Sequence, residues 1–258
     1  MARVRIKDIA EQAGVSPATV SRYLNNTPGA MTEETRARIA EVVERTGYRP
    51  LAAARSLRTD RSQLLGVVLA DIANPYSSAM LEALSREAEA AGYSLMTAIA
   101  GNDPAAEASA LERLLGAGAD ALIINTCGGN DEALRDASLR VPVVLLDRDL
   151  DGSIAGGGKR LDLVTSNNSE LVDGLVEELV GCGCKRILLF TQAGVSSSIR
   201  RERAASFTDD LARRGVAGEV VALGDDEGAS AQAAKLVDVI GKKGPVGLIS
   251  INGLVFLQ

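Results

Sequence analysis

Apolar positions follow two different spacings along the 258-residue chain, and the change falls near residue 60. In the first part they recur at helical intervals, as at Ile6, Ile9, Ala10 and Ala13, which mark one face of a short helix. From residue 64 onward, continuous apolar runs of strand length alternate with helical patterns. The pattern therefore predicts a small helical head followed by a larger α/β body.

Three short helices are predicted in the head. Gly14 is placed to end the first helix. Ser16 and Pro17 suit the start of the second, because Ser caps a helix and Pro fits its first turn. Thr32 and Gly47 bound the third. The faces expected to be buried in the second and third helices carry Val20, Tyr23, Leu24, Ile39, Val42 and Val43.

Two helices joined by a short glycine turn form a helix-turn-helix, whose second helix can lie in the major groove of DNA. We expect Ala18 and Arg22 to face base edges, because an Arg can pair bidentately with guanine. Thr19, Ser21 and Asn25 have the size and chemistry to hydrogen-bond phosphates. The alternative is a small three-helix bundle whose polar residues are merely solvated.

The body is predicted to contain parallel sheets covered by helices on both faces, because its strands are continuously apolar. The glycine-rich segment 151–159 separates four expected strands from four others, and we place the boundary between two lobes there. The expected strands are 64–71, 93–100, 121–126, 141–147, 161–166, 186–192, 219–223 and 246–252, and the expected helices are 77–91, 104–117, 130–139, 169–181, 201–214 and 229–242.

Composition excludes several classes of protein. The chain has no His, which removes Ser-His-Asp and Cys-His triads and zinc-protease motifs. Its three cysteines, Cys127, Cys182 and Cys184, are too sparse for a zinc site. The first expected strand is followed by DIANPY rather than by a glycine-rich phosphate loop. We therefore expect no metal, no cofactor and no enzymatic activity.

The N-terminus lacks the apolar core of a signal peptide, and no apolar run reaches the length of a membrane helix. We expect a cytoplasmic protein that does not bind membranes. Charge is uneven along it: residues 1–61 carry 11 basic and 7 acidic residues, whereas the whole chain has a net charge of −6. A basic head on an acidic body suggests that the head meets a polyanion.

Polar residues follow the expected strands of the body, where two parallel α/β lobes bind small ligands. Amides, carboxylates and a flat ring are the groups that recognise sugar hydroxyls and the apolar face of a sugar. The residues so placed are Asn74, Tyr76, Thr126, Asp147, Arg148, Asn167, Asn168 and Asn252. The sequence therefore predicts a carbohydrate site between the lobes.

The stretch IKDIAEQAGVSPATVSRYLN, followed by ETRARIAEVVERTGYRP and ARSLRTDRSQLLGVVLADIANPY, resembles the LacI/GalR family of bacterial transcription regulators. The resemblance covers essentially the whole chain. It implies that the second helix of the head recognises DNA, and that Pro17 and Ala18 stand where family members vary to select an operator. Small apolar residues at these two positions give more weight to Arg22.

By the same resemblance, residues 51–59 form a hinge helix that orders on DNA and enters the minor groove. Leu57 matches the family's leucine wedge, and Ala53 and Ala54 are small enough for two such helices to approach closely. Arg55, with Arg58, would meet the DNA backbone or the groove edge. The alternative is a plain linker. Leu51 stands where the family usually has an asparagine, so the resemblance does not extend to a polar contact by residue 51 at the start of the hinge.

The segment SSSIRRERAASF matches the family's pocket arginine segment, which assigns Arg203 to the effector, and Asp147 and Asn252 match pocket positions as well. Ser206 replaces a usual glycine, and Gly253 replaces a usual aspartate. Two arginines, Arg148 and Arg203, favour a negatively charged effector such as a gluconate-type sugar acid. The alternative is that Arg148 pairs with an acidic neighbour, Asp149 or Asp151, at the rim of the cleft.

The sequence thus predicts a helix-turn-helix domain over 1–50, a hinge over 51–62, and effector-domain lobes over 63–160 and 161–258. Family members continue past the position of Gln258, so we expect the second lobe to be incomplete. The resemblance implies a homodimeric repressor that binds a palindromic double-stranded DNA operator and responds to a small carbohydrate. The rival functions are a carbohydrate-binding module without a regulatory role and an NAD-dependent enzyme.

Overall fold

The computed structural model describes residues 4–48, 61–150, 160–192, 197–223 and 245–253. The chain divides into two compact units between Ser62 and Gln63, each described here by itself. None of the helices in the described ranges is long and apolar enough to cross a membrane.

The first unit is the predicted three-helix head, built from α1 (Ile6–Ala13), α2 (Pro17–Leu24) and α3 (Glu33–Thr46). Its core is formed by the apolar positions that the helical spacing singled out, among them Ile9, Val20 and Ile39, all with no exposed surface. The expected faces of the three helices therefore meet in one core. The hinge segment lies outside the described residues.

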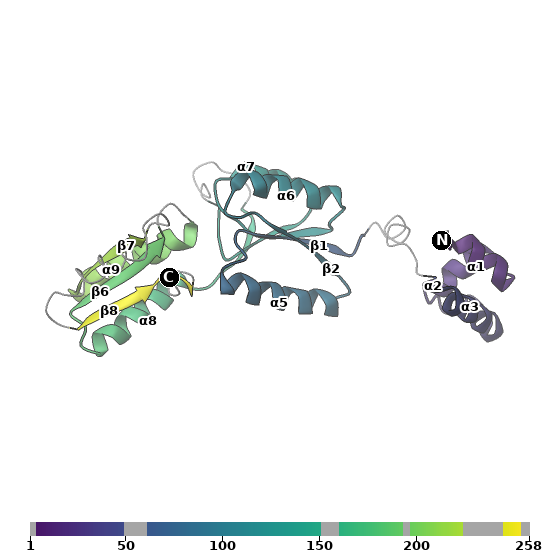
Figure 1. The fold of residues 1–258 in the computed structure, drawn as a ribbon, viewed down its shortest axis with the longest axis horizontal. Coiled ribbons are helices and arrows are strands. Elements are labelled where there is room, and N and C mark those ends of the chain that lie inside the picture. The colour runs from purple at the N-terminus through teal and green to yellow at the C-terminus, as the bar shows by residue number, and fades with distance from the viewer. Residues whose placement is uncertain (1–3, 49–60, 151–159, 193–196, 224–244, 254–258) are drawn as a thin grey trace. The chain divides into compact units, whose positions relative to one another are not determined.

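The second unit begins with a sheet of five parallel strands in the order β2-β1-β3-β4-β5. The helix α5 covers one face and α6 and α7 cover the other (Figure 1). The elements are β1 (Leu64–Leu69), α5 (Pro75–Ala90), β2 (Ser94–Ile99), α6 (Pro104–Gly116), β3 (Ala121–Asn125), α7 (Asp131–Arg140), β4 (Val143–Leu146) and β5 (Asp162–Val164).

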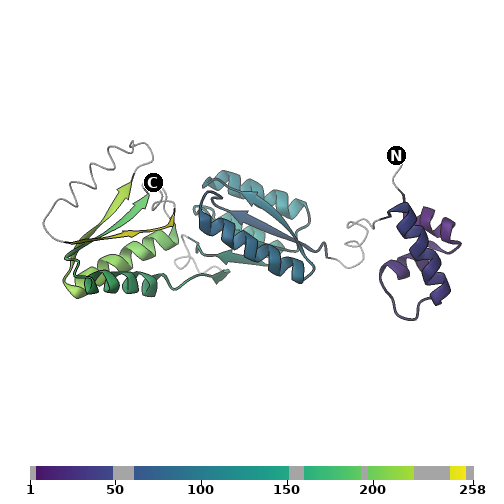
Figure 2. The ribbon, with the colours of Figure 1, turned by 60° about the horizontal axis from the view of Figure 1, so that its bottom comes forward.

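A second sheet of three parallel strands follows, in the order β7-β6-β8. Its helices α8 and α9 pack against each other along the same face of the sheet (Figure 2). The elements are α8 (Asn168–Gly181), β6 (Arg186–Gln192), α9 (Ser198–Arg214), β7 (Ala217–Leu223) and β8 (Val246–Ser250). Each sheet has its own apolar core, so the predicted parallel α/β class with two lobes is confirmed.

One detail of the predicted organisation is wrong. The glycine-rich segment was expected to separate four strands from four, but β5 pairs with β4 and extends the first sheet. The backbone pairs Leu145 with Leu163 in parallel register. Among the described residues, the first sheet therefore has five strands and the second has three. The helix expected over 229–242 lies outside the described residues.

Candidate functional site

The turn between α1 and α2 is fixed by backbone geometry. Gly14 adopts the left-handed conformation, with φ of 63°, and its N–H donates to carbonyl oxygens at the end of α1. Ser16 then caps α2, because its Oγ accepts from the backbone N–H of Thr19 at 3.2 Å. Pro17 fills the first turn of α2, where its missing N–H costs nothing.

This turn leaves an outward face on α2. Pro17, Ala18, Arg22 and Asn25 are exposed, whereas Val20 on the opposite side is fully buried. Within the described residues, the exposed guanidinium of Arg22 makes no hydrogen bond or ion pair, so it is available to a partner. The structure therefore places the residues predicted to read bases on one accessible surface.

The residues predicted to contact phosphates are held by local contacts on the same helix. The hydroxyl of Thr19 lies 2.9 Å from that of Ser16, and both Thr19 and Ser21 are half-buried. The side-chain amide of Asn25 donates to the carbonyl oxygen of Ser21. The other predicted DNA residues, Ala54, Arg55 and Leu57, lie outside the described residues.

A cavity of about 280 Å³ in the second unit gathers most of the predicted effector residues. It is lined by Asn74, Tyr76, Asp147, Arg148, Ser166, Ser197, Ile199, Arg200, Arg203, Ile251, Asn252 and Gly253. Six of the nine residues predicted for this site are in the lining. The other three are not: Thr126 and Asn168 are each only 1% exposed, and Asn167 caps α8.

Arg203 is held in place by two hydrogen bonds. Its Nε donates to Oδ1 of Asn168 at 2.8 Å, and its Nη1 donates to the carbonyl oxygen of Ile251, also at 2.8 Å. Asn168 is buried, and its amide nitrogen donates to Glu202 at 3.0 Å. The side chain of Arg203 is therefore oriented before any ligand arrives.

Asp147 supplies the carboxylate in the cavity lining and occupies a left-handed conformation, with φ of 70°. Its N–H donates to the carbonyl oxygen of Val164 at 2.7 Å, so β5 helps to fix this turn. Burial raises the pKa of Asp147, and the positive charges of Arg203 and Arg148 oppose that rise. Asp147 and these two arginines thus form one electrostatic group.

Arg148 points inward rather than along the rim. Only 8% of its surface is exposed, and its Nη1 donates to the carbonyl oxygen of Thr126 at 3.0 Å. Burial lowers its pKa, while Asp147 is the largest of the acidic influences that raise it. The alternative of a rim pair with Asp149 does not describe this geometry, and Asp151 lies outside the described residues.

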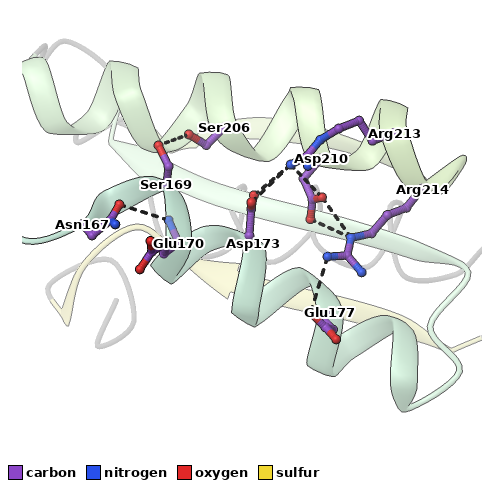
Figure 3. Close-up of polar contacts among 9 residues, drawn as sticks. All are labelled: Asn167, Ser169, Glu170, Asp173, Glu177, Ser206, Asp210, Arg213 and Arg214. Carbon is purple, nitrogen blue, oxygen red and sulfur yellow. Dashed lines mark hydrogen bonds and ion pairs between the residues drawn. The ribbon is translucent and has the colours of Figure 1, made fainter.

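The packing of α8 against α9 fixes the spacing between Asn168 and Arg203. Asp210 on α9 is 1% exposed and accepts from Nε of Arg214 at 2.9 Å, while Arg213 reaches Asp173 on α8 (Figure 3). Near the cavity, the hydroxyl of Ser206 lies 2.9 Å from that of Ser169 (Figure 3). Ser206, at a position where the sequence resemblance implies a glycine, therefore adds a contact between the two helices.

Sequence reasoning missed several lining residues, which include Ser166, Ser197, Ile199, Arg200 and Ile251. Three of them belong to the start of α9, which was expected at residue 201 but begins at Ser198. Ser197 caps the helix through its hydroxyl, and Arg200 donates to Gln192 at 2.8 Å. The signal available in the sequence was the serine before the helix, because Ser favours the N-cap position.

Two family models match the chain. The model described as bacterial regulatory proteins, lacI family, matches residues 5–50. The model described as periplasmic binding proteins and sugar binding domain of LacI family matches residues 62–252.

Individual relatives agree with these matches. The HTH-type transcriptional regulator PtxS of Pseudomonas plecoglossicida is 35% identical over 257 residues, which cover 99% of this chain and 73% of that protein. The structure of the lac repressor dimer bound to operator and the anti-inducer ONPF matches with a TM-score of 0.77 at 24% identity, covering 93% of this chain and 71% of that chain. The Cra regulator of Pseudomonas putida, in complex with fructose 1-phosphate, matches with a TM-score of 0.62 at 25% identity, covering 76% of this chain and 71% of that chain.

Proposed function

This chain belongs to the LacI family of bacterial regulatory proteins, and from that premise we propose that it is a repressor controlled by an anionic carbohydrate. It is a DNA-binding transcriptional regulator with a sugar-binding domain. The proposal adds a palindromic operator, a homodimer in the cytoplasm that associates with the nucleoid when bound to DNA, and a sugar acid as the effector. The proposed domains are 1–50, 51–62, 63–160 and 161–258, with β5 pairing to the first sheet.

The exposed face of α2 supports the DNA-binding half of this proposal. Arg22 is accessible and unpaired within the described residues, so its planar fork is free to pair with a guanine. Pro17 and Ala18 lie near the start of the same helix, where a recognition helix approaches base edges. Thr19, Ser21 and Asn25 are assigned to phosphate contacts that set the register of the helix.

The hinge residues extend the DNA contact in this proposal. Leu57 acts as an apolar wedge in the minor groove, beside Ala54 and Arg55, when two chains bind one operator. Such a wedge unstacks a base step at a cost of a few kcal/mol, which the contacts of the bent DNA offset. Twofold symmetry then relates two half-sites about one helical turn apart.

The charge of the cavity lining is the observation that carries the effector half. The lining holds three guanidinium groups, of Arg148, Arg200 and Arg203, against the carboxylate of Asp147. Arg203 is oriented by two hydrogen bonds and Arg148 by one. A guanidinium fixed in this way favours a carboxylate or phosphate on the ligand. The Cra regulator, which has a similar fold, was solved with a phosphorylated sugar.

Selection of bound DNA fragments by the purified protein, followed by release with a panel of metabolites, tests the whole proposal. We expect an inverted-repeat site to be enriched and a sugar acid or sugar phosphate to release it. Leu57→Ala should weaken binding to the selected site far more than binding to random duplex. Equal losses on both duplexes would remove the hinge from the proposal, and release by neutral sugars alone would remove the anionic effector.

A further inference from the structure

Glu107 is a fully buried carboxylate behind the cavity, in the first turn of α6, and it does not line the cavity. Four groups donate to it. Oε1 accepts from the Thr126 hydroxyl at 2.9 Å and from the Asn130 amide at 3.4 Å. Oε2 accepts from the backbone N–H of Cys127 at 2.7 Å and from its thiol at 3.2 Å.

These contacts fix the loop that follows β3. The hydroxyl of Thr126 also accepts from the N–H of Gly128 at 3.1 Å, so it links Glu107 to the turn beyond. Gly128 and Gly129 both have positive φ, at 87° and 76°. Helices and strands do not use such backbone angles, so this loop is not held by the hydrogen bonds of regular secondary structure. Burying a carboxyl group is costly unless its oxygens find hydrogen-bond donors, and here the loop provides those donors.

The loop in turn holds an arginine of the cavity. The carbonyl oxygen of Thr126 accepts from Nη1 of Arg148 at 3.0 Å, and Arg148 lines the cavity. Glu107 is therefore linked to the ligand site through one residue, Thr126. The Thr126 side chain bonds to Glu107, and the Thr126 main-chain carbonyl bonds to Arg148.

We propose that Glu107 is a positioning residue for anion recognition: it locks the loop at Thr126, and the Thr126 carbonyl aims Arg148 at the negatively charged group of the effector. The ligand part of this inference rests on the proposed function. The positioning part rests on the chain of hydrogen bonds from Glu107 to Arg148.

Glu107→Gln is a sharp test because the amide has the size of the carboxylate but only one acceptor atom. Either orientation turns its NH₂ group toward a donor, either the Cys127 N–H or the Asn130 amide. The loop must then shift although the core volume is unchanged. Glu112→Gln is the matched control, because Glu112 lies on the same helix, is largely exposed and pairs with Arg140 at 2.9 Å.

The binding experiment uses the full chain with gluconate and glucose as probes in isothermal titration. We expect Glu107→Gln to weaken gluconate binding about tenfold, as loss of a charge-assisted hydrogen bond does, and to leave glucose binding unchanged. Glu112→Gln should bind both probes like the native chain. Unchanged gluconate affinity in Glu107→Gln overturns the positioning role while the anionic effector stands. Equal losses for both probes also overturn it, because they indicate general damage.

Two measurements decide the positioning role without a ligand. Burial and then the Glu107 carboxylate raise the pKa of the Cys127 thiol to about 12. In a Cys182→Ser, Cys184→Ser background, Glu107→Gln should therefore lower the pKa of Cys127 and speed its alkylation at pH 8. We expect about a tenfold increase in rate, because a pKa lower by about one unit raises the thiolate fraction tenfold.

The second measurement is a double-mutant cycle of Glu107→Gln with Arg148→Met in denaturant unfolding. If Glu107 acts through the loop on Arg148, the denaturation midpoint of the double variant falls by less than the sum of the shifts in the two single variants. Additive shifts, or an unchanged alkylation rate, overturn the inference. Failure of gluconate to bind the native chain would instead count against the proposed effector, and the cycle would still decide the role of Glu107.

Discussion

Nη1 of Arg203 lies 2.8 Å from the carbonyl oxygen of Ile251, so an arginine of α9 is fastened to the end of β8. Its Nε is fastened at the same time to Asn168, at the start of α8. Three elements of the second lobe therefore converge on one guanidinium. The Arg203 side chain is therefore already ordered in the folded protein, so ligand binding costs less of its conformational entropy.

Replacing Arg203 with Lys should weaken effector binding although the positive charge is kept. An ammonium is a point donor and cannot keep both fixed contacts while presenting a planar fork to the ligand. We expect a loss of about 1.5–3 kcal/mol, or roughly tenfold to a hundredfold in affinity. Titration calorimetry against the effector found by the metabolite panel measures it. Arg201→Lys, on the exposed side of α9, should bind normally, and a similar loss there would contradict the assignment.

Replacing Asp147 with Asn should raise the stability of the ligand-free protein at neutral pH. Burial raises the pKa of Asp147 above its ordinary value of 3.8, so the folded state binds this proton more tightly than the unfolded state. The resulting stability is fully present below the ordinary pKa and is lost as pH rises through the raised value. The advantage of Asn should therefore be largest at pH 7 and shrink toward pH 4, as thermal unfolding across that range would show.

Asp147→Ala is the control for this pH dependence, because it also removes the charge. Asn tolerates the left-handed backbone at residue 147, where φ is 70°, but Ala has no side-chain hydrogen bond to support it. We expect Ala to be about 1 kcal/mol less stable than Asn at every pH. A native chain whose melting temperature follows the same pH profile as both variants would show that Asp147 does not titrate in this way.

The sequence predicted local order well because the signals were local. The helix caps at Gly14 and Ser16 and the apolar runs of β1, β3 and β6 depend on neighbouring residues. The sheet membership of β5 could not be predicted in this way. The strand is only three residues long and partly exposed. Its position in the first sheet is set by pairing with β4 rather than by its own pattern of apolar residues.

The candidate site was predictable where residues follow strands, as at Asp147 and Arg148, because parallel strands bring their carboxyl ends together. The supporting residues were not predictable from spacing. Glu107 reads as one polar residue on an amphipathic helix, and only the turn after β3 shows why it is buried. Likewise, Arg200 joins the lining because α9 begins before the position its apolar spacing indicated.

Replacing Gly66 with Ala should destabilise the first lobe. A Cβ at Gly66 on β1 would lie 2.5 Å from Cδ2 of Leu122 and 3.1 Å from Cδ1 of Leu114, both essentially buried. Overpacking of this kind costs about 1–3 kcal/mol. Gly174→Ala is the matched control, since nothing lies within 4 Å of its Cβ and α8 should gain about 0.5–1 kcal/mol. Denaturant unfolding should move the two variants in opposite directions.

Replacing Arg22 with Ala should reduce the preference for the operator rather than binding to DNA in general. The side chain is exposed and, within the described residues, unpaired, so the fold of the head should not change. Loss of a bidentate contact to a base is expected to cost about 1–3 kcal/mol on the selected site and little on random duplex. Fluorescence anisotropy with both duplexes, at a stated salt concentration, measures the two affinities.

Ser21→Ala provides the contrast, because a phosphate contact carries no sequence information. Its affinities for the selected site and for random duplex should fall by similar factors. If Arg22→Ala also weakened both duplexes equally, the base contact would have to be reassigned to another residue of α2, and the neighbouring Ala18 would be the next to replace. A larger side chain at Ala18 should then change which operator is selected, because it would meet the base edges first.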